Sequence, residues 1–212
     1  MRIISGTLRG RVLKTARGEG FRPAMGRTRE ALFSLLTARG IDWPRTRVLD
    51  LFAGSGSLAF EAVSRGAPEA LVVEKAEEAV RCLRRNIADL CLEGKVSLVR
   101  DDALRFLRRT SVTGIGLVFL DPPYRENFIA PCLALLPPHL AADAFVTAEI
   151  EKEAELGATP DCLAPEAERL FGRTRVLVWR FRSGGDPQHS DPPASAALCM
   201  ESRCVLEGNM TS

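Results

Sequence analysis

The sequence has 212 residues, a hydrophobic fraction of 46% and a net charge of only +2, as expected of a globular protein with one sizeable core. Its charge is uneven, because residues 1–29 hold eight basic side chains and one acid. This excess favours a polyanionic partner at the amino-terminal end. The six cysteines form no Cys-x-x-Cys pair and the histidines number two, which predicts free thiols in a cytoplasmic protein without a metal site.

The sequence predicts neither a signal peptide nor a membrane helix. The first residues contain no continuous apolar core of sufficient length. The least charged stretch, residues 128–142, is interrupted by Pro131, Pro137 and Pro138, which rules out an ordinary membrane helix. From Ser183 onward the composition turns to Gly, Pro, Ser, Asp and Ala with little periodicity. We therefore expect residues 183–212 to form a disordered tail.

The amino-terminal arm, residues 1–24, is predicted to be a small basic β-hairpin. Its apolar residues alternate loosely around Gly6 and Gly10. A solvated edge ribbon has the same pattern, but basic side chains at this density favour contact with phosphates of a nucleic acid. The candidate RNA-binding residues are Arg2, Arg9, Arg11, Lys14 and Arg22.

After a helix predicted over residues 27–36, the most informative stretch of the chain begins. Residues 48–52 predict a buried strand that carries one carboxylate, Asp50. Gly54 and Gly56 supply a tight turn, because residues without a Cβ turn most sharply. A helix follows the turn. A strand, a glycine turn and a helix in this order are typical of a nucleotide-binding site, where backbone approaches a ligand at the helix amino terminus.

Two ligands compete for this turn, and a tight turn without any ligand has the same local pattern. Residues 54–59 fit the dinucleotide-binding motif, and Glu74 follows at about the spacing of a ribose-binding acid, which favours NAD. Asp50, however, would repel the pyrophosphate of a dinucleotide. A carboxylate there suits the ammonium group of S-adenosylmethionine (AdoMet). We favour AdoMet and keep an NAD-dependent oxidoreductase as the alternative.

The next two predicted strands also end in acids. The strand over residues 70–74 ends at Glu74, and the strand over residues 96–100 ends at Asp101-Asp102-Ala103. Each acid alone could be the cap of the helix that follows it. Three successive strand ends with carboxylates are a stronger signal, because open α/β sheets bind ligands at the carboxyl edge.

The fourth predicted strand, residues 115–120, runs directly into Asp121-Pro122-Pro123-Tyr124. Two prolines prevent further strand pairing and make the turn rigid. An exocyclic base amine is a poor nucleophile, and the Asp121 carboxylate and the Pro122 carbonyl would accept its N–H groups. Tyr124 would stack on the base, a contact of roughly 1–3 kcal/mol. A paired base would first have to be flipped out.

The rest of the ordered chain completes the predicted fold. A helix is expected over residues 127–136 and a fifth strand over residues 144–150. Residues 170–171 and 174–181, hinged at Gly172, predict a closing antiparallel pair. The alternation of strands and helices predicts a doubly wound α/β sheet.

Taken together, these motifs resemble the bacterial 16S ribosomal RNA guanine-N2 methyltransferase family, RsmD, from about Arg2 to Phe181. The motifs that carry the likeness are Arg2-Ile-Ile-Ser-Gly, Arg9-Gly-Arg, Arg22-Pro23, Arg27-Thr-Arg-Glu, Asp50-Leu-Phe-Ala-Gly-Ser-Gly and Asp121-Pro-Pro-Tyr. The resemblance implies a Rossmann-like class I AdoMet-dependent fold of seven strands with a reversed carboxyl-terminal hairpin. It also implies methylation of the N2 amine of a guanine in 16S rRNA. Residues 24–26 depart from the family pattern.

The resemblance also implies roles for individual residues. Asp50 and Gly54 would lie against the methionine part of AdoMet, Glu74 would hold the ribose, and Asp102 with Ala103 the adenine. Gly56 is a further candidate for cofactor binding, and Asp121, Pro122 and Tyr124 would receive the guanine. We expect the methyltransferase domain to span residues 25–182 and to act as a monomer on 16S rRNA or the small ribosomal subunit. An amino-methyltransferase for another nucleic acid or for protein, and a non-catalytic RNA-binding protein, are the alternatives.

Overall fold

The computed structural model describes residues 1–15, 23–123 and 127–183, without the side chains of residues 23–25. Three features of the sequence analysis lie outside the described residues. These are Arg22, Tyr124 and all of the predicted tail beyond Ser183.

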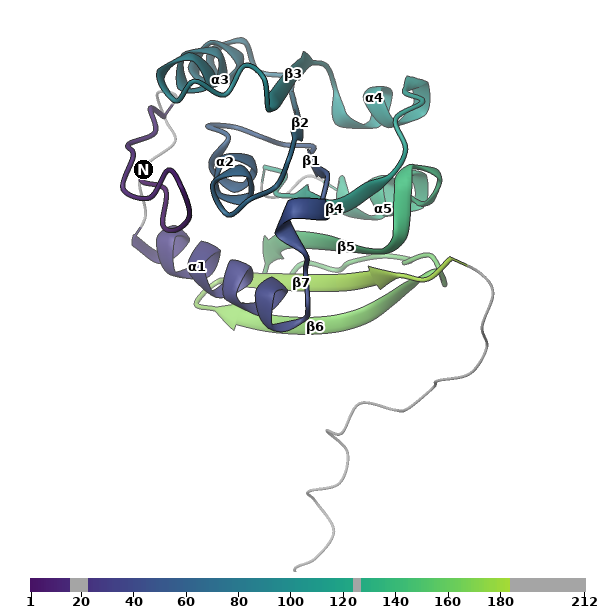
Figure 1. The fold of residues 1–212 in the computed structure, drawn as a ribbon. Helices are drawn as coiled ribbons and strands as arrows, with labels where there is room; N and C mark the ends of the chain where they lie inside the picture. Colours follow the sequence, from purple (N-terminus) through teal and green to yellow (C-terminus); the bar gives the residue numbers. More distant parts are fainter. Residues whose placement is uncertain (16–22, 124–126, 184–212) are drawn as a thin grey trace, which may run out of the picture.

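One seven-stranded sheet runs through the molecule (Figure 1). Its strands are β1 (Val48–Asp50), β2 (Ala70–Glu74), β3 (Val96–Arg100), β4 (Ile115–Leu120), β5 (Leu140–Glu151), β6 (Leu163–Phe171) and β7 (Thr174–Phe181). They are arranged in the order β3-β2-β1-β4-β5-β7-β6. The first five are parallel, whereas β7 is antiparallel to both β5 and β6. The predicted doubly wound sheet with a reversed last hairpin is confirmed.

Helices cover both faces of the sheet. They are α1 (Pro23–Ala38), α2 (Ser57–Ser64), α3 (Glu77–Asp89), α4 (Ala103–Arg109) and α5 (Ile129–Leu135), with 3-10 turns at Trp43–Arg45 and Pro137–His139. α1, α2 and α3 lie on one face and α4 and α5 on the other (Figure 1). Phe33, Phe60 and Leu83 belong to the core of the first face, and Phe106 and Leu133 to that of the second. No helix of the described ranges is both long and apolar enough to cross a membrane.

Three elements are longer than the sequence predicted. α1 begins at Pro23, because a proline in the first helical turn has no intrahelical N–H bond to lose. β5 gains its first residues from Leu140 onward, and β6 begins at Leu163. β6 lies at the edge of the sheet and is buried only at Leu163. An edge strand needs no apolar alternation and tolerates Pro165, so its sequence lacks the usual strand pattern.

The described part of the amino-terminal arm forms the predicted hairpin in a reduced form. A single antiparallel bridge pairs Arg2 with Val12. Ile3 and Leu13 are each only 2% exposed and belong to the core beneath α1, α2 and α3. The arm is therefore anchored on the sheet domain by its own apolar side chains.

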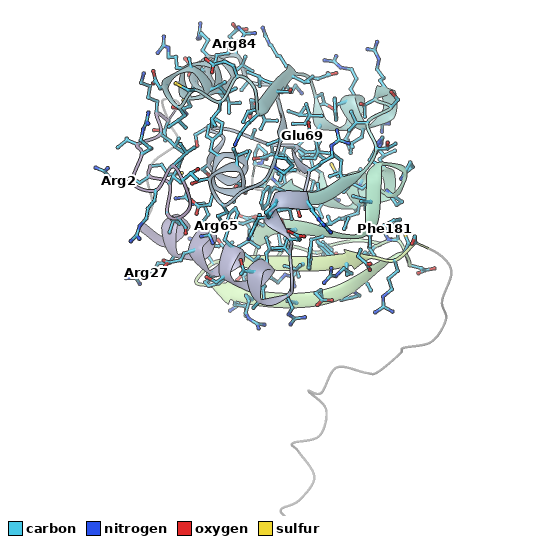
Figure 2. The ribbon with its side chains drawn as sticks, viewed as in Figure 1. Arg2, Arg27, Arg65, Glu69, Arg84 and Phe181 are labelled. Atoms are coloured by element: carbon cyan, nitrogen blue, oxygen red, sulfur yellow. The ribbon has the colours of Figure 1, made fainter. Side chains whose placement is uncertain are left out.

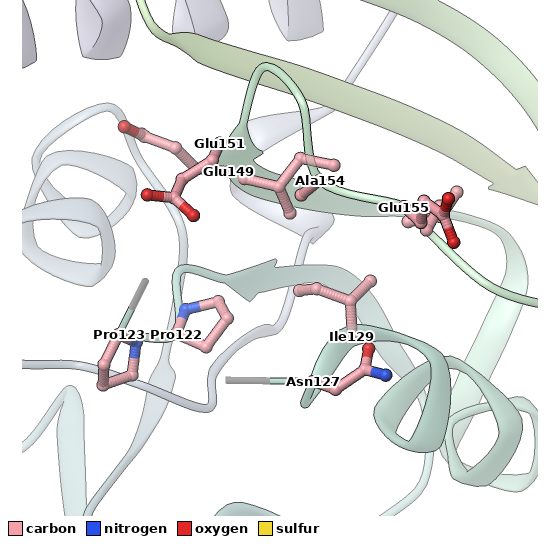
Figure 3. Close-up of a pocket in the computed structure, with 10 residues that line it drawn as sticks. Pro122, Pro123, Asn127, Ile129, Glu149, Glu151, Ala154 and Glu155 are labelled. Carbon is pink, nitrogen blue, oxygen red and sulfur yellow. The ribbon is translucent and has the colours of Figure 1, made fainter. Parts of the chain in front are cut away.

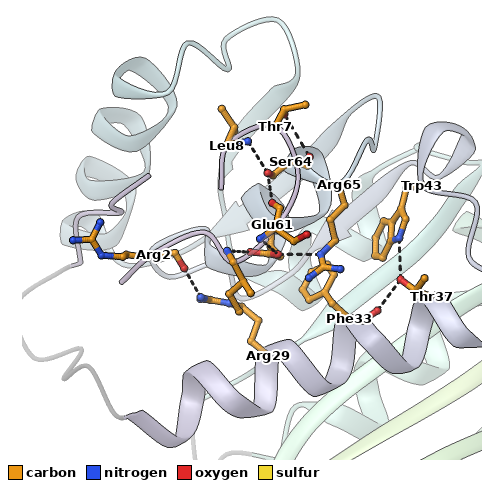
Figure 4. Close-up of polar contacts among 12 residues, drawn as sticks. Arg2, Thr7, Leu8, Arg29, Phe33, Thr37, Trp43, Glu61, Ser64 and Arg65 are labelled. Carbon is orange, nitrogen blue, oxygen red and sulfur yellow. Dashed lines mark hydrogen bonds and ion pairs between the residues drawn. The ribbon is translucent and has the colours of Figure 1, made fainter. Parts of the chain in front are cut away.

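The carboxylate of Glu61 in α2 ties the first residues of the arm to the domain (Figure 4). Glu61 is completely buried. Its two oxygens accept hydrogen bonds from the backbone N–H of Ile4 at 2.7 Å and from that of Ser5 at 3.0 Å. The Arg65 guanidinium donates to the same carboxylate at 2.9 Å. These three donors satisfy a charge that would otherwise be costly to bury.

Ser64, one turn further along α2, holds the loop of the arm. Its carbonyl accepts from the N–H of Thr7 at 2.7 Å, and its hydroxyl accepts from the N–H of Leu8 at 2.9 Å. Gly6 has φ +83°, and a Cβ there would lie 1.8 Å from the Ser64 carbonyl oxygen. Only glycine allows this approach, so the arm packs on α2 in one defined position.

Candidate functional site

The glycine turn after β1 is shaped by close packing. Gly54 and Gly56 both have positive φ, at +51° and +82°. A Cβ on Gly56 would lie 2.4 Å from the ring of Phe60 and 2.7 Å from the side chain of Leu83. The turn therefore requires glycine at position 56 for steric as well as conformational reasons. It delivers the chain into α2, which begins at Ser57.

Asp50, at the end of β1, is a buried carboxyl group without a full set of partners. It is 1% exposed, and its Oδ1 has no hydrogen-bond partner among the described residues. Burial raises the pKa of Asp50 to about 7, although the N–H groups of Phe52 and Ala59 oppose the rise, and the nearby Glu74 carboxylate adds to it. A buried acid in this state would be stabilised in its ionised form by a cationic group.

Glu74, at the end of β2, binds two backbone N–H groups. Its Oε2 accepts from Gly54 at 2.8 Å and its Oε1 from Ala76 at 2.7 Å. Ala76 is the residue that precedes α3. The side chain thus links the glycine turn to the start of α3, as the simple capping interpretation expected. Each carboxylate oxygen has a second lone pair for another donor, so ribose binding stays a prediction.

Asp102, at the end of β3, caps α4. Its Oδ1 accepts from the N–H of Arg105 at 3.2 Å, and its Oδ2 lies 3.3 Å from Lys75 Nζ. Partial burial works against ionisation, but these donors together lower the pKa of Asp102. Ala103, the first residue of α4, is buried. The cap interpretation is confirmed, and contact of Asp102 and Ala103 with adenine remains a prediction.

The three acids lie at one edge of the sheet, as predicted. β1, β2 and β3 are adjacent parallel strands, so their carboxyl ends meet. The carbonyl of Glu74 accepts from the N–H of Asp101 at 3.2 Å. This edge lies beside the point where the strand order reverses, between β1 and β4, which is where open α/β sheets bind ligands.

Asn86 of α3 was missed by the sequence analysis. It is 1% exposed. Its Nδ2 donates to the carbonyl of Ser55 at 3.0 Å and to that of Lys14 at 2.9 Å, and its Oδ1 accepts from the N–H of Lys14 at 2.9 Å. One amide therefore connects the glycine turn with the arm. Asn86 follows Leu83 by three residues and precedes Leu90 by four, so it lies on the apolar side of α3. A polar residue in that position was the local signal that could have identified it.

The turn after β4 forms one wall of a pocket of about 260 Å³ (Figure 3). Pro122 is buried and Pro123 exposed. The end of β5 lies opposite and contributes Glu149 and Glu151 to the lining. Burial raises the pKa of Glu149 above its ordinary value. Like the first four strands, β5 ends in acids, a signal that was present in the sequence but not predicted as part of the site.

The predicted RNA-binding side chains of the arm that the structure describes, Arg2, Arg9, Arg11 and Lys14, are all exposed. Lys14 pairs with Asp89 of α3 at 2.6 Å, and Arg11 donates to the Asp89 carbonyl at 2.6 Å. An exposed pair of this kind contributes only about 0–1 kcal/mol, so it leaves the cations available to phosphates.

Exposed basic side chains also lie outside the arm. Arg2 of the arm and Arg27 of α1 project at the left of the molecule, and Arg84 of α3 projects at its top (Figure 2). Arg84 is distant from the basic amino-terminal end along the chain, so the sequence alone did not identify it as a candidate.

The four cysteines within the described ranges are free thiols, as predicted. Burial raises the pKa of Cys132 to about 12, so that thiol stays protonated and unreactive. Among the same residues, no group of three or more His, Cys, Asp and Glu side chains is placed to hold a metal ion.

Comparison with known proteins identifies the family. Residues 1–180 match the family model described as Conserved hypothetical protein 95. The chain is 33% identical to Ribosomal RNA small subunit methyltransferase D of Escherichia coli K12, over 88% of this chain and 92% of that protein. The protein of the same name from Haemophilus influenzae is 34% identical over 76% of this chain and 83% of its own length.

The solved structures agree. A structure titled "Putative methyltransferase yhhF from Escherichia coli" has 32% sequence identity and a TM-score of 0.75, covering 86% of this chain and 98% of its own. The structure of a hypothetical protein from Thermus thermophilus has 31% identity and a TM-score of 0.70, covering 84% and 98%. The chain therefore belongs to the family of the ribosomal RNA small subunit methyltransferases D.

Proposed function

We propose that this chain transfers a methyl group from AdoMet to the exocyclic N2 amine of a guanine in 16S rRNA. Its substrate is 16S rRNA or the small ribosomal subunit, on which it acts as a cytoplasmic monomer. The observation that carries the proposal is the buried Oδ1 of Asp50, without a partner among the described residues, beside the glycine turn. Membership of the small-subunit rRNA methyltransferase D family supplies the substrate class.

The residues at the edge of β1 and β2 fit AdoMet better than NAD. A pyrophosphate would bring two negative charges toward Asp50, whose pKa is already raised to about 7 by burial and by Glu74. The ammonium group of AdoMet has the opposite charge and would lower that pKa. Glycine at position 56 allows the turn to pack directly against Phe60.

Each cofactor role then falls to one strand end. Asp50, Gly54 and Gly56 hold the methionine part, Glu74 holds the ribose hydroxyls through its remaining lone pairs, and Asp102 with Ala103 borders the adenine. When bound, AdoMet supplies a methyl group activated by its sulfonium centre. The chain's own contribution is orientation, because holding reactants in line converts a bimolecular step into a unimolecular one.

The Asp121-Pro122 turn prepares the guanine amine for that step. The lone pair of the amine is delocalised into the ring, so the two N–H groups must be held out of the plane of conjugation. The Asp121 carboxylate and the Pro122 carbonyl accept one N–H each, and Tyr124 stacks on the base. The methylated amine is cationic and loses its extra proton to water, so Asp121 acts mainly as a hydrogen-bond acceptor.

The arm, residues 1–24, binds the RNA, while residues 25–182 form the domain that catalyses methyl transfer. Arg2, Arg9, Arg11, Lys14 and Arg22 bind phosphates, each contact releasing counterions. Replacing Arg9 and Lys14 with Ala should therefore weaken RNA binding and flatten its salt dependence by about one unit of slope per phosphate contact.

The direct test is transfer of a tritiated methyl group from AdoMet to small ribosomal subunits that lack this modification, followed by mapping of the labelled base. We expect label on N2 of one guanine of 16S rRNA. Absence of label, or label on another atom or base, would refute the proposal. Calorimetry with AdoMet and with NAD, side by side, tests the cofactor separately. Tight binding of NAD alone would favour the alternative of an NAD-dependent oxidoreductase.

A further inference from the structure

The pocket beside the Asp121 turn contains a carboxylate that the chemistry above does not use. Glu149 lies near the carboxyl end of β5 and lines the pocket together with Pro122 and Pro123 (Figure 3). The sheet register places it next to the reaction site. Leu120 pairs with Ala148, so the residues that follow on the two parallel strands are Asp121 and Glu149.

The Glu149 carboxylate is available to a ligand. It is partly buried, which raises its pKa, and it makes no hydrogen bond or ion pair with another described residue. The nearest basic residue by strand register is Arg175, which pairs with Ile150. Arg175 instead donates to the Ala154 carbonyl at 2.8 Å and pairs with Glu168 at 3.8 Å. A carboxylate withdrawn from water without such a partner is stabilised by N–H donors from a bound molecule.

Guanine offers these donors in the required arrangement. Its Watson–Crick edge places the N1–H group directly beside the N2 amine, so one base can address two neighbouring carboxylates. Adenine and cytosine have a ring-nitrogen lone pair at the corresponding position, and an ionised carboxylate has no proton to offer it. A flipped-out base is recognised by hydrogen bonds to this same edge.

We propose that Glu149 accepts the N1–H of the target guanine, while Asp121 and the Pro122 carbonyl receive the adjacent N2 amine. Glu149 is thus a specificity-determining residue that selects guanine by a proton that adenine and cytosine lack. The inference rests on the proposed function, because it assigns the second carboxylate of the same site.

The test replaces the N1–H of the substrate. Small ribosomal subunits are reconstituted with 16S rRNA in which a synthetic segment carries either guanine or 2-aminopurine at the methylated position. 2-Aminopurine keeps the reactive amine but has a lone pair at N1. We expect the wild-type protein to prefer guanine by about tenfold to a hundredfold in kcat/KM, the range of one hydrogen bond to a charged group.

The variant Glu149→Gln should lose that preference. Its amide can donate to the N1 lone pair of 2-aminopurine, so methylation of guanine falls while methylation of 2-aminopurine is maintained or rises. Glu149→Asp keeps a carboxylate and should retain the preference at a lower rate. Glu153→Gln is the matched control, because Glu153 is exposed and does not line the pocket; it should behave like the wild type. AdoMet affinity, measured by calorimetry, should be unchanged in all three.

The outcomes separate this inference from the proposed function. If the wild-type protein does not methylate guanine at all, the proposed function fails. If it methylates guanine but Glu149→Gln keeps the wild-type preference over 2-aminopurine, the inference alone is overturned. Loss of the preference in Glu149→Asp and Glu149→Gln to the same extent would also overturn it, because packing and not charge would then be responsible.

Discussion

Replacing Asp50 with Asn should stabilise the ligand-free protein at neutral pH and impair its binding of AdoMet. Burial raises the pKa of Asp50 from 3.8 to about 7. Each pKa unit corresponds to about 1.36 kcal/mol, so the ionised carboxylate costs the folded state about 4 kcal/mol. Asn has nearly the same shape and carries no charge, so it removes this cost.

The sign of the pH dependence follows from the raised pKa. Between about pH 4 and pH 7 the folded protein keeps the Asp50 proton while the unfolded chain has lost it. Wild-type stability therefore falls as the pH rises through this window, and the full cost is present above about pH 7. Asp50→Asn lacks this dependence. The stability difference between variant and wild type should shift by about 4 kcal/mol in favour of the variant from about pH 4 to pH 8.

Urea unfolding of both proteins at several pH values measures this shift directly, since other titrating groups cancel between them. Repeating the series with AdoMet tests the binding role. A ligand at about one hundred times its dissociation constant stabilises the folded state by about 2.7 kcal/mol, and we expect this gain in the wild type but not in Asp50→Asn. A constant difference across the pH range would contradict the raised pKa, and equal stabilisation of both proteins by AdoMet would contradict the ammonium contact.

Three further predictions concern residues that join distant parts of the molecule or perform the chemistry. Glu61→Ala should lower the free energy of unfolding by about 3–5 kcal/mol, because it leaves buried donors unpaired. As a control, Ala in place of the exposed acid Glu69 should cost about 0–1 kcal/mol. Similar losses for the two variants in urea unfolding would argue against the role of Glu61 in holding the arm. Asn86→Ala should destabilise the folded protein by about 1–3 kcal/mol for each buried group left unpaired, and it should weaken AdoMet binding. Unchanged AdoMet affinity in calorimetry would show that Asn86 does not support the cofactor site through the glycine turn. For Asp121, the single-turnover rate of methyl transfer should fall in the order wild type, Asn variant, Ala variant. If Asp121 were a general base, the Asn variant would be nearly as slow as the Ala variant, since such catalysis contributes on the order of 10²–10⁴-fold. A near-normal rate for the Ala variant would exclude Asp121 from the mechanism.

Local patterns in the sequence determined much of the architecture. The order of strands and helices from residue 47 onward is visible as apolar periodicity, since a strand or helix buries one face whatever its neighbours are. The same holds for the ends of β1 to β4, where acids and glycines follow directly on apolar runs. Because parallel strands finish at one edge, the sequence alone predicted that Asp50, Glu74, Asp102 and Asp121 would gather there.

Tertiary structure decided the features whose partners lie far apart along the chain. Glu61 holds Ile4 from 57 residues away, and Asn86 holds Lys14 from 72 residues away. In each case the sequence shows a polar residue within a helix but not its hydrogen-bond partners, because only folding brings these partners near. The same holds for Glu149, because it becomes a candidate site residue only when the fold places it in one pocket with Pro122 and Pro123, which follow β4. Of the edge strand β6, only residues 170–171 were predicted, for the complementary reason. A strand that pairs on one side and buries little needs no apolar pattern, so pairing with β7 determines the rest of its length.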